Sequence, residues 1–189
     1  MFAGIVQAVG RIARVSPHEI DCAGLDRADV APGDSICVQG ACLTVVKLTE
    51  RGFTADVSAQ TLAVTTGLER PGEVNLEKAL RAGDAVGGHL VAGHVDGVGE
   101  LVRREGSVFR FRVPAGLEKY VARKGSICID GVSLTVNAVE GREFDVNLIP
   151  HTLQVTTLGR LAAGSKVNLE ADLIARYVER MLSAGKVAA

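Results

Sequence analysis

The chain has 189 residues, of which 47% are apolar and 23% are charged, and its formal net charge is −1. This composition is typical of a globular protein, and the balanced charge excludes a strongly basic surface that would attract nucleic acid or an anionic membrane. The chain has no Trp and only 4% aromatic residues, which argues against a platform that stacks nucleic-acid bases.

The sequence contains no recognisable membrane span, signal peptide or metal motif. Its apolar runs fall short of the about 20 residues that a membrane-spanning helix needs. No two cysteines form a Cys-x-x-Cys pair, and His89 and His94 lack a third ligand at a spacing suited to zinc. We therefore expect a cytoplasmic protein with free thiols, no metal site, and no membrane or nucleic-acid partner. The cysteines are Cys22, Cys37, Cys42 and Cys128.

The two halves of the chain repeat each other. Residues 35–66 and 126–157 are identical at 14 of 32 positions when they are aligned at a constant offset of 91. Residues 74–77, which read Val-Asn-Leu-Glu, return as residues 167–170. Two copies of this length predict two small domains of one fold, each able to hold a similar ligand.

A second internal repeat locates the start of each domain. Residues 3–10 resemble residues 92–99, so each of these segments opens one copy of the fold. A Gly-rich stretch precedes the second of them. We expect domains over residues 1–86 and 87–170, followed by a helix and tail over residues 171–189.

Both halves have the pattern of short strands. Residues 35–38, 43–48 and 53–57 are rich in β-branched and apolar side chains and are separated by turn residues. Gly52 and Gly141 stand where hairpins would reverse. The fold class expected is mainly β, and short strands at close spacing favour antiparallel barrels, in which closure removes exposed sheet edges.

The tail departs from this pattern and predicts an amphipathic helix. Asp172 is a suitable N-cap and Gly185 a suitable stop. The apolar residues between them recur at helical spacing on one face: Ile174, Tyr177, Val178, Met181 and Leu182. This face packs either on its own barrel or in an oligomer, and in the second case truncation after Glu170 would yield a monomer.

Three mismatches between the copies distinguish the two candidate sites. Cys42 aligns with Ser133, Gln39 with Asp130, and Ile5 with His94. His94 is the natural group to titrate near neutral pH, or else it is a loop histidine that bonds nearby backbone. Asp130 and Ser133 could hold an activated water or could cap a turn. Cys42 is either a small buried apolar residue or a nucleophile.

The motifs together resemble the α-chain type of riboflavin synthase over essentially the whole chain. The resemblance rests on motifs that occur in order and in duplicate. They are residues 1–6 (MFAGIV), 42–45 (CLTV), 87–90 (GGHL), 93–97 (GHVDG), 130–136 (DGVSLTV) and 148–153 (LIPHTL).

This resemblance implies two tandem six-stranded antiparallel β-barrels and a C-terminal helix that assembles a homotrimer. It implies that two molecules of 6,7-dimethyl-8-ribityllumazine exchange a four-carbon unit, giving riboflavin and 5-amino-6-ribitylaminouracil. It also implies that no metal or organic cofactor is needed and that the active site lies between the first barrel of one subunit and the second barrel of its neighbour. Association with lumazine synthase is left open.

The resemblance carries site residues onto this chain. Catalytic roles are implied for Phe2, Cys42, His94, Asp130 and Ser133. The pocket of the first barrel is expected to contain Gly4, Ile5, Val6, Ser35, Cys42, Leu43, Thr44, Asp56, Val57, Ser58, Ala59, Gln60 and Thr61. The pocket of the second barrel is expected to contain Gly93, His94, Val95, Lys124, Ser133, Leu134, Thr135, Asn147, Leu148, Ile149, Pro150, His151 and Thr152.

The chain departs from the usual family pattern at three positions, with Ala3 in place of Thr, Gln39 in place of Asn and Gln60 in place of Glu. Residues 16–30 are also shorter than is typical. A non-catalytic lumazine- or flavin-binding protein of the same fold is the alternative function. His89, His94 and the intact residues 133–135 favour catalysis, because such binding proteins lack these features.

Overall fold

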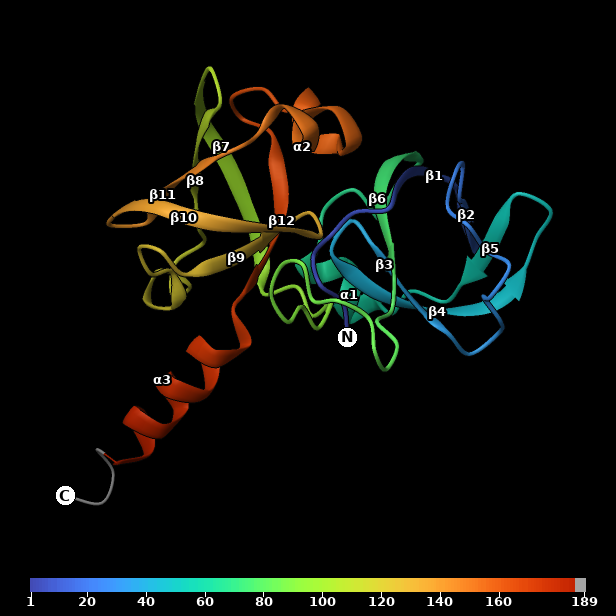
Figure 1. Ribbon diagram of the computed structural model, residues 1–189, viewed down its shortest axis with the longest axis horizontal. Coiled ribbons are helices and arrows are strands. Elements are labelled where there is room, and N and C mark those ends of the chain that lie inside the picture. The colour runs from blue at the N-terminus through green and yellow to red at the C-terminus, as the bar shows by residue number, and fades with distance from the viewer. Residues whose placement is uncertain (186–189) are drawn as a thin grey trace.

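A computed structural model describes residues 1–185, in which two β-barrels lie side by side and a helix projects from the second (Figure 1). The N-terminus lies between the barrels (Figure 1). Residues 186–189 of the predicted tail lie outside the described residues. The predicted fold class, two six-stranded antiparallel barrels followed by a C-terminal helix, is confirmed.

The first barrel closes in the strand order β1-β2-β5-β4-β3-β6. A short helix, α1 (Ala59–Val64), connects β5 to β6. The strands are β1 (Ala8–Val15), β2 (His18–Asp21), β3 (Ser35–Val38), β4 (Ala41–Leu48), β5 (Gly52–Ala55) and β6 (Gly72–Lys78).

The second barrel has the same cyclic order, with β10-β11-β8-β7-β12-β9 closing on itself. Its connection from β11 to β12 contains α2 (Pro150–Val155), the counterpart of α1, followed by a 3-10 turn (Thr157–Arg160). The strands are β7 (Gly97–Glu105), β8 (Val108–Arg112), β9 (Ser126–Ile129), β10 (Val132–Glu140), β11 (Glu143–Asn147) and β12 (Lys166–Ala171).

Each barrel encloses its own apolar core. In β4 the inward residues Ala41, Leu43 and Val45 are buried, while alternate residues face outward. The first core is built mainly from aliphatic side chains, whereas the second also contains Phe109, Phe111 and Phe144. The alternation along β4 and the start of β10 therefore decides which of their motif residues can meet a ligand on the outer wall.

Polar side chains join the two barrels around equivalent residues. The Asn75 side chain donates to the Asp130 carbonyl (2.8 Å) and accepts from the Thr157 amide (2.8 Å). Asn168 repeats this arrangement, donating to the Gln39 carbonyl (2.8 Å) and accepting from the Thr66 amide (2.7 Å). The repeated Val-Asn-Leu-Glu segments thus supply the two asparagines that fasten one barrel to the other.

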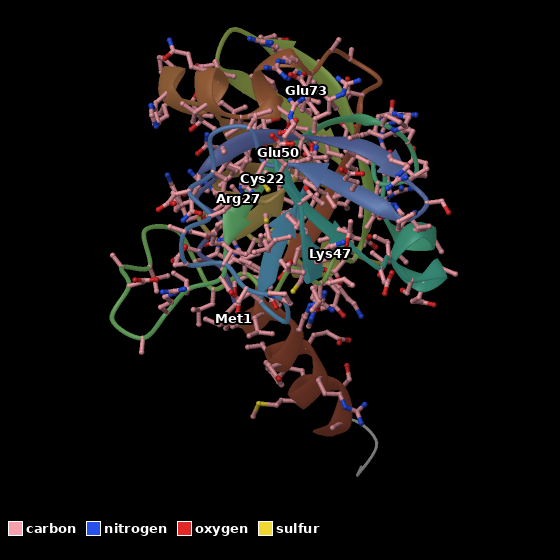
Figure 2. The ribbon with its side chains drawn as sticks, turned by 90° about the vertical axis from the view of Figure 1, so that its right-hand side faces the viewer. Met1, Cys22, Arg27, Lys47, Glu50 and Glu73 are labelled. Carbon is pink, nitrogen blue, oxygen red and sulfur yellow. The ribbon has the colours of Figure 1, made fainter. Side chains whose placement is uncertain are left out.

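The C-terminal helix α3 spans Leu173–Gly185 and stands away from the body of the molecule (Figure 1; Figure 2). Asp172 begins it as predicted, since its carboxylate accepts the Ile174 amide at 2.9 Å. The whole predicted apolar stripe is exposed, between 50% and 75% for each of its residues. The alternative in which this face packs on its own barrel is therefore wrong.

Candidate functional site

The motif residues of each barrel lie on its outer wall. In β4, Cys42 is half-buried and Thr44 is exposed, while Leu43 between them faces the core. Ser133 and Thr135 of β10 repeat this arrangement around the buried Leu134. A ligand that contacts these side chains would bind against the outside of a barrel and would need further protein to cover it.

The strand register adds a partner to each outward residue. Ser35 of β3 pairs with Thr44, as predicted for one pocket, and Cys37 pairs with Cys42. In the second barrel Ser126 pairs with Thr135 and Cys128 with Ser133. The sequence prediction omitted Ser126, although the 91-residue offset from Ser35 was a signal that could have found it.

The segment that precedes each barrel is seated crosswise, meaning that its backbone is hydrogen-bonded to the opposite barrel. The Gly4 carbonyl accepts the Ser133 amide of the second barrel at 2.8 Å, and the Gly93 carbonyl accepts the Cys42 amide of the first barrel at 2.9 Å. Both glycines have positive φ, +74° and +77°. A Cβ on Gly4 would lie 2.6 Å from the Ser133 Cβ, so both backbone conformation and space require glycine here.

This seating corrects the predicted grouping of residues into pockets. Val6 packs against the core of the second barrel and Val95 against the core of the first. Gly4 and Val6 therefore belong with Ser133, and Gly93 and Val95 belong with Cys42. The repeat established which residues are equivalent but carried no information on which barrel each segment contacts.

Ile5 points differently from its neighbours. Its side chain is 47% exposed and lines a cavity of about 770 Å³ that Ser35 also lines. Lys78, Arg81 and Asp84 contribute polar groups to the same cavity. The predicted proximity of Ile5 and Ser35 thus agrees with the structure, although Gly4 and Val6 face the other barrel.

Ser133 has a histidine partner, His89, that the sequence prediction counted in favour of catalysis but did not include among the site residues. His89 Nδ1 lies 2.7 Å from Ser133 Oγ, and burial lowers the pKa of His89. His89 Nε2 is buried without a hydrogen-bond partner among the described residues. A neutral imidazole next to a hydroxyl can accept a proton through it. The signal was the position of His89 after Gly87 and Gly88, which lets the loop approach Ser133.

His94 lies at the other site. Its side chain is exposed, and its backbone amide donates to Glu170 Oε2 at 2.9 Å. Because the adjacent Gly93 is seated on Cys42, His94 belongs with the site of the first barrel. The prediction that groups His94 with Ser133 is therefore wrong, and the crosswise seating is the reason.

Asp130 lies in the junction between the barrels. Its side chain is 1% exposed at the junction between the barrels, where it accepts the Asn168 amide at 2.8 Å. Burial raises its pKa to about 7. Gln39, its equivalent, likewise accepts the Asn75 amide at 2.9 Å. The catalytic role of Asp130 stays a prediction; in the structure this polar mismatch sits in the junction between the barrels.

Phe2 is also enclosed rather than presented to a ligand. It is 0% exposed and packs between the barrels with Val91, Cys37 and Cys128. Its backbone pairs with Val91, in hydrogen bonds of 2.7 and 3.0 Å. Burial raises the thiol pKa values of Cys37 and Cys128. The predicted contact between Phe2 and a reacting ring conflicts with this enclosure.

The remaining candidates surround the outward strands. Ser58 caps α1, accepting the Thr61 amide at 3.0 Å, and Leu148 is fully buried beneath α2. Val57, Thr61 and Thr152 are half-buried. The exposed candidates are Asp56, Ala59 and Gln60 in the first half and Lys124, Asn147, Ile149, Pro150 and His151 in the second. These exposed side chains could complete a ligand site on each barrel.

Residues 1–185 contain neither a metal-binding cluster nor a helix suited to crossing a membrane. No group of three or more His, Cys, Asp or Glu side chains in this part of the chain is arranged to hold a metal ion. Over the same residues, no helix combines the length and the apolar character needed to cross a membrane.

Sequence comparisons agree with the duplicated architecture. The Lumazine binding domain family matches residues 3–79 and again residues 92–172. The riboflavin synthase of Photobacterium phosphoreum is 46% identical over 198 residues, which cover 98% of this chain and 91% of that protein. The riboflavin synthase of Mycobacterium tuberculosis (strain ATCC 25618 / H37Rv) is 48% identical over 201 residues, covering 98% of this chain and all of that protein.

Solved structures share the arrangement of two barrels at lower sequence identity. LumP complexed with riboflavin superposes with a TM-score of 0.77 at 28% identity, covering 90% of this chain and 99% of that chain. LumP complexed with 6,7-dimethyl-8-(1'-D-ribityl) lumazine gives a TM-score of 0.76 at 26% identity, with the same coverage.

Proposed function

The chain belongs to the riboflavin synthase family, and we propose that it converts two molecules of 6,7-dimethyl-8-ribityllumazine into riboflavin and 5-amino-6-ribitylaminouracil. The observation that carries this proposal is the full-length match to riboflavin synthases at 46% and 48% identity. The two equivalent outer walls supply one binding surface for each of the two lumazines.

The second barrel supplies the proton acceptor. A proton leaves a ring methyl of the lumazine for Ser133 Oγ, while the hydroxyl proton of Ser133 moves to His89 Nδ1. The electron pair left on carbon is delocalised into the heteroaromatic ring. The 2.7 Å contact between the two side chains and the lowered pKa of His89 support this role, because the imidazole is neutral and ready to accept.

The first barrel binds the other lumazine without an equivalent base beside its outward strand. Cys42 takes the place of Ser133, and its register partner is Cys37, a buried thiol whose pKa is raised. His94 directly follows Gly93, whose carbonyl accepts the Cys42 amide. Two similar sites with unequal chemistry suit a reaction in which identical molecules act as donor and acceptor.

Assembly completes the sites. Because the motif residues face outward, a neighbouring subunit is needed to enclose the ligand. The exposed stripe on α3 provides an apolar surface for that assembly, and a homotrimer is the state that we propose. The buried free thiols suit a reducing compartment, so we retain the cytoplasmic location; association with lumazine synthase also stays a prediction.

The test is to incubate the purified protein with 6,7-dimethyl-8-ribityllumazine alone and to follow the visible spectrum. Formation of one riboflavin for two lumazines consumed supports the proposal. Lumazine binding with altered fluorescence but no turnover would overturn it and would instead support the non-catalytic binding protein. Cys42→Ala and Ser133→Ala variants then test the unequal roles, since only the second should slow proton abstraction while both sites still bind.

A further inference from the structure

Two buried glutamates occupy equivalent positions at the ends of the barrels' last strands. Glu77 is the penultimate residue of β6 and Glu170 the penultimate residue of β12. They are 3% and 4% exposed. A buried carboxylate is costly unless its oxygens are hydrogen-bonded, so the groups that bind these two indicate why they are there.

The partners of both carboxylates are backbone amides of the segments that open each barrel. Glu77 accepts the Ala3 amide at 2.7 Å and the Gly4 amide at 3.1 Å. Glu170 accepts the Ala92 amide at 2.7 Å and the Gly93 and His94 amides at 2.9 Å each. Each carboxylate thereby fixes two or three successive amides, which defines the path of the segment.

These are the same segments that seat crosswise on the outward strands. The segment held by Glu77 presents the Gly4 carbonyl to Ser133 of the second barrel. The segment held by Glu170 presents the Gly93 carbonyl to Cys42 of the first barrel and carries His94. Each glutamate is therefore linked through a short piece of backbone to the candidate site on the opposite barrel.

We propose that Glu77 and Glu170 are positioning residues, with Glu77 shaping the site around Ser133 and Glu170 shaping the site around Cys42. Each acts across the boundary between the barrels, through backbone amides. This inference rests on the two ligand sites of the proposed function. Neither glutamate needs to touch substrate, and the repeat supplies two independent instances of one arrangement.

Glutamine is the decisive substitution because it keeps the size of the side chain but replaces one acceptor oxygen by an NH₂ donor. That NH₂ group would face backbone N–H groups, so at least one amide in each segment would lose its acceptor. In Glu77→Gln, hydrogen exchange of the Ala3 and Gly4 amides should accelerate at least about tenfold, with exchange in residues 92–94 unchanged. Glu170→Gln should give the reverse.

Double-mutant cycles test the link to the sites. Each glutamine variant should lower kcat/KM by roughly tenfold to a hundredfold. Glu77→Gln should be non-additive with Ser133→Ala but additive with Cys42→Ala. Glu170→Gln should be non-additive with Cys42→Ala but additive with Ser133→Ala. The proposal would be overturned if Glu77→Gln were coupled to Cys42→Ala or Glu170→Gln to Ser133→Ala, because those pairs lie within one barrel. It would also be overturned if all four pairs were additive.

The controls separate positioning from folding and from the proposed function. Glu100→Gln removes a half-buried carboxylate that pairs with Lys166 at 2.8 Å, and it should change neither exchange nor turnover. If a glutamine variant does not fold, the shorter Glu→Asp variant replaces it in the same cycles. Amide exchange requires no ligand, so it can be measured even if the wild type is inactive, a result that would refute the proposed function alone. If either glutamine variant accelerated exchange in both segments, the proposal that each glutamate positions one segment would be refuted.

Discussion

Replacing Asp130 with Asn is expected to stabilise the protein at neutral and alkaline pH. The Asp130 carboxyl is almost fully buried and accepts the Asn168 amide, while its own residue adopts a φ of +49°. Burial raises its pKa to about 7 despite that hydrogen bond. Asn keeps an acceptor oxygen for the Asn168 amide and tolerates positive φ, and Gln39 shows that the equivalent position accepts a neutral amide.

The size of the effect follows from the difference between the folded and unfolded pKa values. An unfolded Asp titrates near 3.9, so between about pH 4 and pH 7 the folded protein binds more protons than the unfolded chain. Stability is therefore lost as the pH rises through this window, by up to about 4 kcal/mol for a shift of about three units. Asp130→Asn removes this cost, and its advantage over the wild type should grow by about 2.5 kcal/mol between pH 5 and pH 8.

Urea unfolding followed by circular dichroism at pH 5, 6, 7 and 8, at one protein concentration, measures the difference. Glu50→Gln is the control, since Glu50 is exposed in the turn between β4 and β5, at the end of the first barrel that faces the viewer in Figure 2. A stability difference between Asp130→Asn and the wild type that is the same at pH 5 and pH 8 would refute the reasoning. Retained turnover in the variant would agree with a junction role rather than a catalytic one.

Three further changes test other parts of the structure. His89→Ala should lower turnover at least about a hundredfold and leave riboflavin binding within about tenfold, and equal losses in both would contradict a role in proton transfer. Truncation after Asp172, which spares β12, should yield a monomer in analytical ultracentrifugation, and an unchanged oligomer would contradict assembly through α3. Ala3→Thr should leave activity within about tenfold, and a larger gain would show that the missing hydroxyl limits the natural chain.

The barrels were predictable because their information is local and duplicated. Runs of β-branched and apolar residues between turn residues marked β3 at its exact bounds and most of β4, and the repeat showed that the same fold occurs twice. Strands β1 and β2 were not predicted, although residues 3–10 were recognised as part of the repeat. The helix from Asp172 was predictable from its cap and its apolar stripe, because both are properties of adjacent turns.

The site was less predictable because its geometry depends on contacts between the barrels. The sequence pattern could not predict that Gly4 contacts Ser133 and that Gly93 contacts Cys42. Both contacts are hydrogen bonds between backbone groups, which do not depend on the type of side chain. Asp130 shows a related difficulty, since its place in the junction could not be read from the sequence. A polar mismatch between repeats marks a ligand site or a junction equally well, and only burial distinguishes them.

Under the proposed function, the duplication keeps the backbone of the two sites alike while their side chains differ. Gly4 and Gly93 share one left-handed conformation, and Glu77 and Glu170 hold equivalent amides, so two identical lumazines meet two similarly shaped walls. The hydroxyl of Ser133 contacts His89. His89 lies before residues 92–99, the segment that repeats residues 3–10, so His89 is not part of that repeated segment. Equal recognition with unequal proton transfer is what a dismutation requires, and a duplicated barrel achieves it by changing side chains on a backbone that both copies share.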